Sequence, residues 1–143
     1  MIKVAIINGP NLNLLGKREP EIYGNKSFKL FFNELVEIFP ELSLSYHQSN
    51  IEGEIVTLIQ EQGFSSDYLI VNAAAYTHTS IAIPDAIAAV PAKVIGVHIS
   101  NIYQREQERH VDLMAKYCFA CLFGFGLSGY RLALEYILTE VNE

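Results

Sequence analysis

Short apolar runs of strand length recur along the chain and are separated by helical patterns. Residues 2–7 are β-branched and almost entirely apolar, as expected for a strand that is covered on both faces. The other runs of this kind are residues 42–47, 68–71, 94–99 and 119–123. Strict alternation of strands and helices predicts a parallel sheet with right-handed crossovers. Five strands in a chain of 143 residues suit a flavodoxin-like α/β fold, a three-layer sandwich whose sheet has the order 2-1-3-4-5.

Apolar residues spaced three or four positions apart predict helices between these strands. The helical segments are residues 28–39, 52–62, part of 81–90, and 130–141. Ser27 is placed to cap the first helix, and residues 49–52 resemble a capping box before the second, which Gly63 can end. The hydroxyl of Thr79 or Ser80 could cap the third helix, or could serve a functional site instead.

The composition suits one globular domain, which we take as residues 1–143. Half of the residues are hydrophobic and 18% are charged, which excludes intrinsic disorder. The formal net charge is −6 and there is no basic run, so nucleic acids and anionic membranes are poor partners. A bound anion would therefore need a local site. The sequence shows neither a signal-peptide core nor an apolar stretch that could span a membrane, which predicts a cytoplasmic protein.

The two cysteines, Cys118 and Cys121, lie in an apolar stretch. Two cysteines are too few for a disulfide scaffold, and the second ligand pair that a zinc site needs is absent from the sequence. A spacing of three within a strand would place the two thiols on opposite faces of the sheet. We therefore expect buried structural thiols.

Polar clusters follow the first, third and fourth predicted strands, at the edge where ligands bind in this class of sheet. They are Asn8 to Asn13 with Arg18 and Tyr23, then Asn72 with Thr77 to Ser80, then His98, Ser100, Asn101, Arg105 and Arg109. In the order 2-1-3-4-5 these three strands are neighbours, so the clusters converge on one rim. The histidines lack the companion carboxylates of a metal site, and no glycine-rich run marks a phosphate loop. The set suits proton transfer on a small anionic polyol or keto acid.

Several of these features also have purely structural interpretations. Residues 8–10 could form only a turn, and the long connection from 16 to 25 could be a mobile lid or a slack loop. We expect His47 to be structural, because it lies within a predicted strand. We expect His110 to be a solvated loop residue, because it follows a polar run.

Six blocks of the sequence resemble the type II 3-dehydroquinate dehydratases (type II dehydroquinases) in order and spacing. They are residues 8–24, 48–54, 76–80, 98–101, 105–110 and 126–130. The resemblance covers nearly the whole chain and implies a flavodoxin-like fold, no cofactor or metal, and a homododecamer built as a tetramer of trimers. It also implies the anti elimination of water from 3-dehydroquinate to 3-dehydroshikimate, a step of the shikimate pathway in aromatic amino acid biosynthesis.

The resemblance assigns roles to particular residues. Tyr23 would accept the proton next to the ketone, and Arg18 would lower the pKa of that tyrosine. Asn11 would stabilise the enolate, and His98 would protonate the leaving hydroxyl. The residues implied to bind the substrate are Asn72, His78, Ile99, Ser100, Arg109 and, from a neighbouring subunit, Asp85.

The chain departs from the family pattern at a few positions. Gly96 stands where the family has a glutamate that supports the acid histidine, and Ala74 stands where glycine is usual. Glu108 replaces a phenylalanine and could pair with Arg109 or repel the substrate, and residues 111–114 lack the family's serine. Without the carboxylate at position 96 we expect a slower or more acid-shifted enzyme, in which Gly96→Glu raises turnover. The alternative is a non-catalytic or weakened member that binds a small carboxylate.

Overall fold

The computed structural model describes residues 1–17, 21 and 25–143, and its core is a five-stranded parallel sheet. The strands are β1 (Ile2–Asn8), β2 (Leu42–Gln48), β3 (Tyr68–Asn72), β4 (Lys93–His98) and β5 (Ala120–Phe123). Their order is β2-β1-β3-β4-β5, and every neighbouring pair is parallel. The predicted flavodoxin-like order is confirmed. All five residues of β3 are buried, as expected for a central strand covered on both faces.

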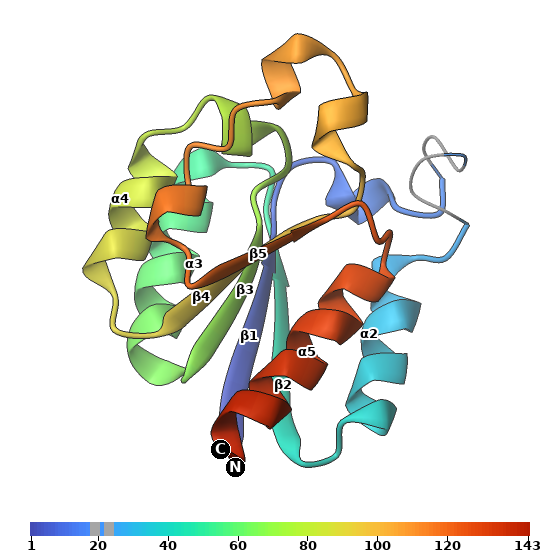
Figure 1. Ribbon diagram of the computed structural model, residues 1–143, viewed down its shortest axis with the longest axis vertical. Helices are drawn as coiled ribbons and strands as arrows, with labels where there is room; N and C mark the ends of the chain where they lie inside the picture. Colours follow the sequence, from blue (N-terminus) through green and yellow to red (C-terminus); the bar gives the residue numbers. More distant parts are fainter. Residues whose placement is uncertain (18–20, 22–24) are drawn as a thin grey trace.

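In the described part of the chain, two α-helices cover each face of the sheet, which makes three layers (Figure 1). The helices are α2 (Phe28–Ile38), α3 (Glu52–Ser65), α4 (Ala82–Ala89) and α5 (Ser128–Val141). Buried residues of α2 and α5, such as Phe31 and Leu134, pack with one face of the strands. Ile59 of α3 and Ile87 of α4 belong to the second apolar cluster on the other face.

The hydroxyls of Ser27 and Ser80 cap α2 and α4. The Ser27 Oγ accepts from the amide of Leu30 at 3.3 Å, and the Ser80 Oγ accepts from the amide of Ile83 at 3.0 Å. The sequence allows Ser80 either to cap the helix or to serve a functional site, and the structure shows the helix cap.

The ends of α3 differ from the prediction. The helix continues to Ser65, and Gly63 lies inside it, where an added Cβ would come within 2.5–2.7 Å of the Val90 side chain. This glycine allows the close approach of the segment after α4. The capping box is also wrong, because the Ser49 hydroxyl accepts from Ile51 and pairs with Glu54, while no side chain caps the helix.

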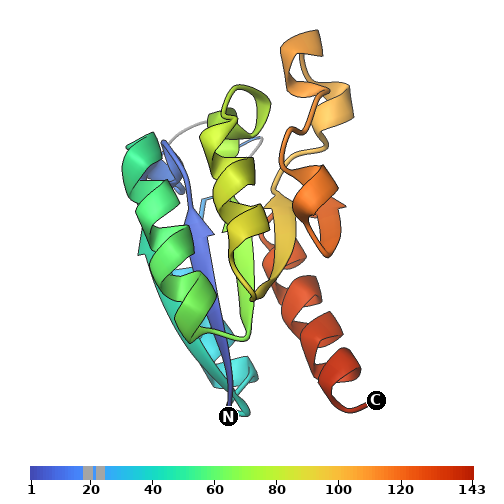
Figure 2. The ribbon, with the colours of Figure 1, turned by 90° about the vertical axis from the view of Figure 1, so that its left-hand side faces the viewer.

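The connection from β4 to β5 extends beyond the carboxyl ends of the strands, whereas both termini lie at the opposite end of the molecule (Figures 1 and 2). It contains three short 3₁₀ helices, η3 (Ile102–Gln104), η4 (Gln107–Arg109) and η5 (Ala115–Tyr117). Among the described residues, no helix is both long and apolar enough to cross a membrane.

The two thiols lie next to each other and not on opposite faces of the sheet. Cys118 precedes β5, so the alternation of a strand does not apply to the pair, and the two thiols are hydrogen-bonded. Both sulfurs lie 3.4 Å from the point that a Cβ on Gly96 would occupy. The expected burial is also wrong, because Cys118 is half-buried and Cys121 is exposed.

Candidate active site

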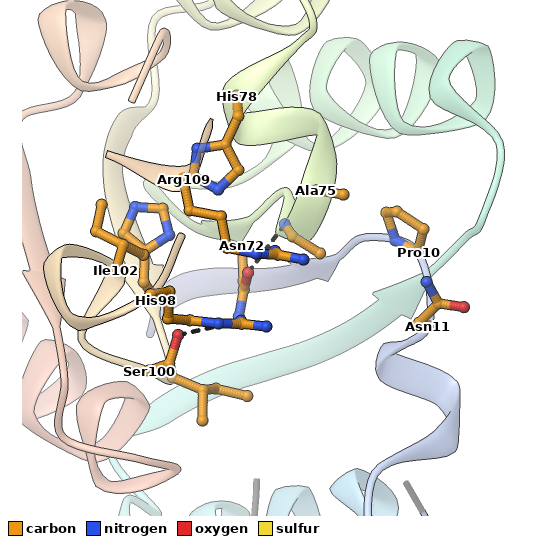
Figure 3. Close-up of a pocket in the computed structure, with 12 residues that line it drawn as sticks. Pro10, Asn11, Asn72, Ala75, His78, His98, Ser100, Ile102 and Arg109 are labelled. Carbon is orange, nitrogen blue, oxygen red and sulfur yellow. Dashed lines mark hydrogen bonds between the residues drawn. The ribbon is translucent and has the colours of Figure 1, made fainter. Parts of the chain in front are cut away.

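A cavity opens at the carboxyl ends of β1, β3 and β4, where the sequence places its polar clusters (Figure 3). Pro10 and Asn11 lie on one side of it, across from His98 and Arg109. The predicted site residues that line it are Asn11, Asn72, His78, His98, Ile99, Ser100 and Arg109. The convergence of the three clusters on one rim therefore agrees with the structure.

A buried hydrogen-bond chain supports Asn72 beneath the cavity. The Asn72 Nδ2 donates to the Tyr130 hydroxyl at 2.9 Å, and that hydroxyl donates to the Asn8 Oδ1 at 2.8 Å. The Asn72 Oδ1 accepts from the amide of Ala74 at 3.0 Å. Burial raises the pKa of Tyr130, so this phenol stays protonated and the hydrogen-bonded group of Asn8, Tyr130 and Asn72 stays neutral.

The turn after β1 packs directly against the loop after β3. An added Cβ on Gly9 would lie 2.6 Å from the Ala73 carbonyl oxygen, and the Gly9 amide donates to the Asn72 carbonyl at 2.7 Å. Two residues that border the cavity have left-handed backbones, Asn11 with φ 69° and Ala74 with φ 51°. This is strained for an alanine, because its Cβ crowds the backbone in that region. The turn at residues 8–10 therefore also forms part of the cavity wall.

His98 is buried at the end of β4 and paired with a carboxylate that the sequence did not lead us to expect. Its Nε2 lies 2.7 Å from the Oδ2 of Asp112, and the two side chains are 6% and 11% exposed. Our expectation that His98 lacks a carboxylate partner is wrong. The hypothesis of a weakened binding protein loses its basis, because it depended on that missing group.

Asp112 is held in place and ionised by its contacts. Its Oδ1 accepts from the amides of Met114 and Ala115, each at 3.0 Å. Burial raises the pKa of Asp112, but the hydrogen bond and charge of His98, with the two amides, outweigh burial and hold that pKa below its usual value. The one sequence signal for Asp112 was its place among residues 111–114, where the family's serine is missing.

Two arginines reach the cavity from the connection after β4. The Arg109 Nε donates to the Glu106 carboxylate, which lowers the pKa of Glu106. Of the two roles left open for Glu108, the pairing with Arg109 is not seen, because Arg109 pairs with Glu106. Arg105 also lines the cavity and donates to the Ser100 hydroxyl at 3.4 Å. The sequence places Arg105 in the polar cluster after β4, and the structure adds it to the cavity lining.

Two further histidine rings tie the surrounding loops together. The Nδ1 of His78 lies 2.8 Å from the carbonyl oxygen of Val111, to which it donates. His110 is half-buried, and its Nε2 donates to the Arg105 carbonyl at 2.9 Å, so the prediction of a solvated residue is wrong. His47 hydrogen-bonds Ser45 within β2 and lies away from the cavity.

The structure does not bring every predicted residue to the cavity. Asp85 is exposed on α4 and is absent from the cavity lining of this chain. Arg18 and Tyr23 lie outside the described residues. Within the described part of the chain, no three histidine, cysteine or acidic side chains are grouped closely enough to hold a metal ion.

The fold and the site together define a flavodoxin-like α/β protein with a small polar cavity at the carboxyl edge of its sheet. The sequence model of the family described as "Dehydroquinase class II" matches residues 2–138. The chain belongs to this family.

Named relatives and solved structures agree with this assignment. A 3-dehydroquinate dehydratase of Francisella philomiragia is 49% identical, over 97% of this chain and 96% of the relative. The crystal structure of a type II dehydroquinase from Butyrivibrio crossotus is 42% identical, with a TM-score of 0.91 over 94% of this chain and 96% of that one. The type II dehydroquinase from Propionibacterium acnes is 35% identical, with a TM-score of 0.93 over 97% of both chains.

Proposed function

We propose that the chain catalyses the anti elimination of water from 3-dehydroquinate to 3-dehydroshikimate, as a single catalytic domain of residues 1–143. This is a step of the shikimate pathway in aromatic amino acid biosynthesis. One observation carries the proposal. A buried histidine, His98, faces a cavity bordered by amides and arginines, in a chain that matches the class II dehydroquinases along nearly its whole length.

The described residues have complementary parts in this reaction. His98 gives a proton to the leaving hydroxyl, which then departs as water. Asn11 stabilises the enolate that forms at the ketone, because a fixed dipole costs little reorganisation as negative charge develops. Asn72 and the backbone amides of Ile99 and Ser100 hold the substrate carboxylate.

The remaining contacts are to the ring hydroxyls of the substrate. His78 and Arg109 border the cavity and bind these hydroxyls from the side opposite Asn11. Arg105 adds a second positive charge at the same rim. A local group of cations explains how a protein with a net charge of −6 can bind an anionic substrate.

The base of the reaction is Tyr23, which lies outside the described residues, as does Arg18. A free tyrosine has a pKa of about 10, so a role as base near neutral pH requires a decrease of about 2–3 units. A guanidinium about 4 Å away supplies about 4 kcal/mol, which is enough for this decrease. The lid that the sequence allows at residues 16–25 falls largely on positions outside the described residues.

We further propose that twelve copies assemble as a tetramer of trimers in the cytoplasm, with Asp85 of one copy reaching the site of its neighbour. The exposure of Asp85 on α4 and of Ile81, just before the helix, supports a contact there. Light scattering measures the assembly directly, and a monomer would contradict the proposal. Asp85→Asn then raises KM if this side chain completes a neighbouring site.

The experiment that tests the activity is a direct assay. We expect an increase in enone absorbance when the protein is mixed with 3-dehydroquinate. Calorimetry with the same substrate provides the binding measurement. Binding without a change in absorbance, even at high protein concentration, would contradict the proposed reaction and leave a carboxylate-binding protein.

A further inference from the structure

The pairing of His98 with Asp112 joins two buried groups that are far apart in the sequence. The Nε2 of His98 and the Oδ2 of Asp112 are 2.7 Å apart, and neither side chain is more than 11% exposed. An ion pair that is shielded from water in this way is little weakened by salt. The contact therefore influences the orientation of the ring.

The segment that carries Asp112 is fastened on both sides of this residue. The carbonyl of Val111 accepts from His78, and the amide of Leu113 donates to the Thr77 carbonyl at 3.0 Å. The carboxylate itself is fixed by the amides of Met114 and Ala115, which use its Oδ1 and leave Oδ2 for His98. Asp112 is thus a rigid acceptor in a fixed position.

Strand β4 does not supply a carboxylate to this ring. Side chains two residues apart in a strand share a face, and the position two before His98 is Gly96. The space that a Cβ would enter there is bounded by the Met114 Cε at 3.3 Å and by the sulfurs of Cys118 and Cys121 at 3.4 Å. The acidic partner of the histidine comes from the connection after β4 instead.

We propose that Asp112 is the positioning residue for His98 in the dehydration, an inference that rests on the proposed function. The Asp112 carboxylate accepts a hydrogen bond from the Nε2 of His98, which fixes the orientation of the ring and keeps a proton on this nitrogen. Nδ1 makes no hydrogen bond within the described part of the chain, so it is the nitrogen left to act in the cavity.

The proton balance of the step follows from this arrangement. The base takes the proton next to the ketone, and the electron pair of that C–H bond ends in the new C=C bond. The C–O bond breaks, and the oxygen takes the Nδ1 proton of His98 and leaves as water. His98 remains neutral with its proton on Nε2, still held by Asp112. Proton exchange with solvent then restores both groups.

The test uses two substitutions that remove the charge and keep an oxygen for the two amides, Asp112→Asn and Asp112→Ser. We expect kcat to fall by about 10- to 100-fold in both, with little change in KM. The matched control is Asp67→Asn. Asp67 is exposed just before β3, at the end of the strands opposite the cavity, and its carboxylate accepts from the Lys3 amide. Wild-type kcat in both Asp112 variants would overturn the proposal.

A pH profile separates positioning of His98 from a merely structural role of Asp112. A positioning role predicts that Asp112→Asn shifts the pH profile of kcat, whereas a merely structural role lowers kcat equally at every pH. Imidazole NMR resonances follow the same change at His98 without substrate. The other titratable or charged side chains around this ring are His78, Arg105, Arg109, Cys118 and Cys121.

The thiol of Cys121 is the other group that could change the pH profile of kcat. The hydrogen bond from Cys118 lowers the pKa of Cys121 to about 7. We therefore compare the single variant Cys121→Ser with the double variant that also carries Asp112→Asn, and the shift of the profile between them should be unchanged. Disappearance of the shift in this background would assign the effect to the thiol and overturn the proposal.

Gly96→Glu gives an independent test of the same idea. A carboxylate already faces His98, and the space next to Gly96 is filled, so this substitution does not raise kcat in the wild-type chain. A clear increase in kcat would show that His98 lacked support and would overturn the role of Asp112. An inactive wild-type protein would instead refute the proposed reaction, and the NMR titration would still report whether Asp112 controls the ring.

Discussion

The two sides of the cavity are built from different chemistry. The amide side, formed by Asn11 and Asn72 after β1 and β3, is neutral, and a buried phenol holds Asn72 in place. The charged side, formed by His98, Arg105 and Arg109 after β4, contains ionisable groups paired with carboxylates or polar side chains. Both sides meet at the same edge of the sheet.

This difference indicates a division of labour. The amide side fixes the position of the substrate with hydrogen bonds that do not change between acidic and neutral pH, because the pKa values of the phenols beneath it, Tyr46 and Tyr130, are both raised by burial. The charged side moves protons, so its state must respond to pH. Substitutions on the two sides should therefore affect different measured quantities.

The largest expected effect comes from removing the proton donor on the charged side. His98→Gln should lower kcat by about 10²- to 10⁴-fold, the usual contribution of a general acid, while the protein remains folded. Enone absorbance measures kcat, and circular dichroism checks the fold. His47→Gln, at a half-buried histidine of β2, is the matched control. Near-normal kcat in His98→Gln would remove His98 from the chemistry.

A substitution beneath the amide side should mainly reduce stability. Tyr130→Phe leaves the Asn8 oxygen and the Asn72 amide without their buried partner, which should lower the free energy of unfolding by about 1–3 kcal/mol. KM should rise, and the pH profile should keep its shape. Urea denaturation measures the loss, with Tyr136→Phe on the exposed surface as control. A shifted pH profile would contradict the separation of the two sides.

On the charged side, the free energy of unfolding should depend on pH through Asp112. The pKa of Asp112 is lowered in the folded protein, so its contribution to stability is present above its ordinary value of 3.8 and is lost as the pH falls through the lowered one. The free energy of unfolding of the wild type should therefore fall more steeply below pH 4 than that of Asp112→Asn. Equal slopes in urea denaturation at acidic pH would contradict this coupling.

The smallest expected effect concerns the strained loop of the amide side. Ala74 has φ 51°, so Ala74→Gly should raise the free energy of unfolding by about 0.5 kcal/mol, after the greater chain entropy of glycine is counted. Ala75→Gly, at a neighbour without a positive φ, should lower that free energy instead. If both changes destabilise the protein equally, the backbone at Ala74 is not strained.

Much of the fold could be predicted because it depends on local patterns that repeat. The β-branched run of β1 and the apolar spacing of α2 identify their elements directly. Alternation then predicts a parallel sheet, and five strands in a chain of this length suit the order 2-1-3-4-5. The amide side followed from the same argument, because Asn72 ends a strand and Asn11 follows its neighbour.

The predictions failed where the sequence has no regular spacing of apolar residues. Asp112 lies between 3₁₀ helices, and no regular spacing indicates that its carboxylate meets His98 across 14 residues. Cys118 lies just before β5, so alternation misplaced its thiol. Gly63 was taken for a helix end because the close contact with Val90 is a tertiary feature that a local pattern does not encode.

The origin of the carboxylate beside His98 also has an evolutionary consequence. Position 96 lies two residues before His98 in the same strand, and Asp112 contacts the ring directly. The residue at one position therefore changes which residues are compatible with activity at the other. Installing an acidic residue at 96 while Asp112 remains would crowd two like charges, and losing Asp112 while Gly96 remains would leave the ring unsupported. The two sites are therefore epistatic, and a viable path between the two arrangements must alter them together or pass through a poorer enzyme.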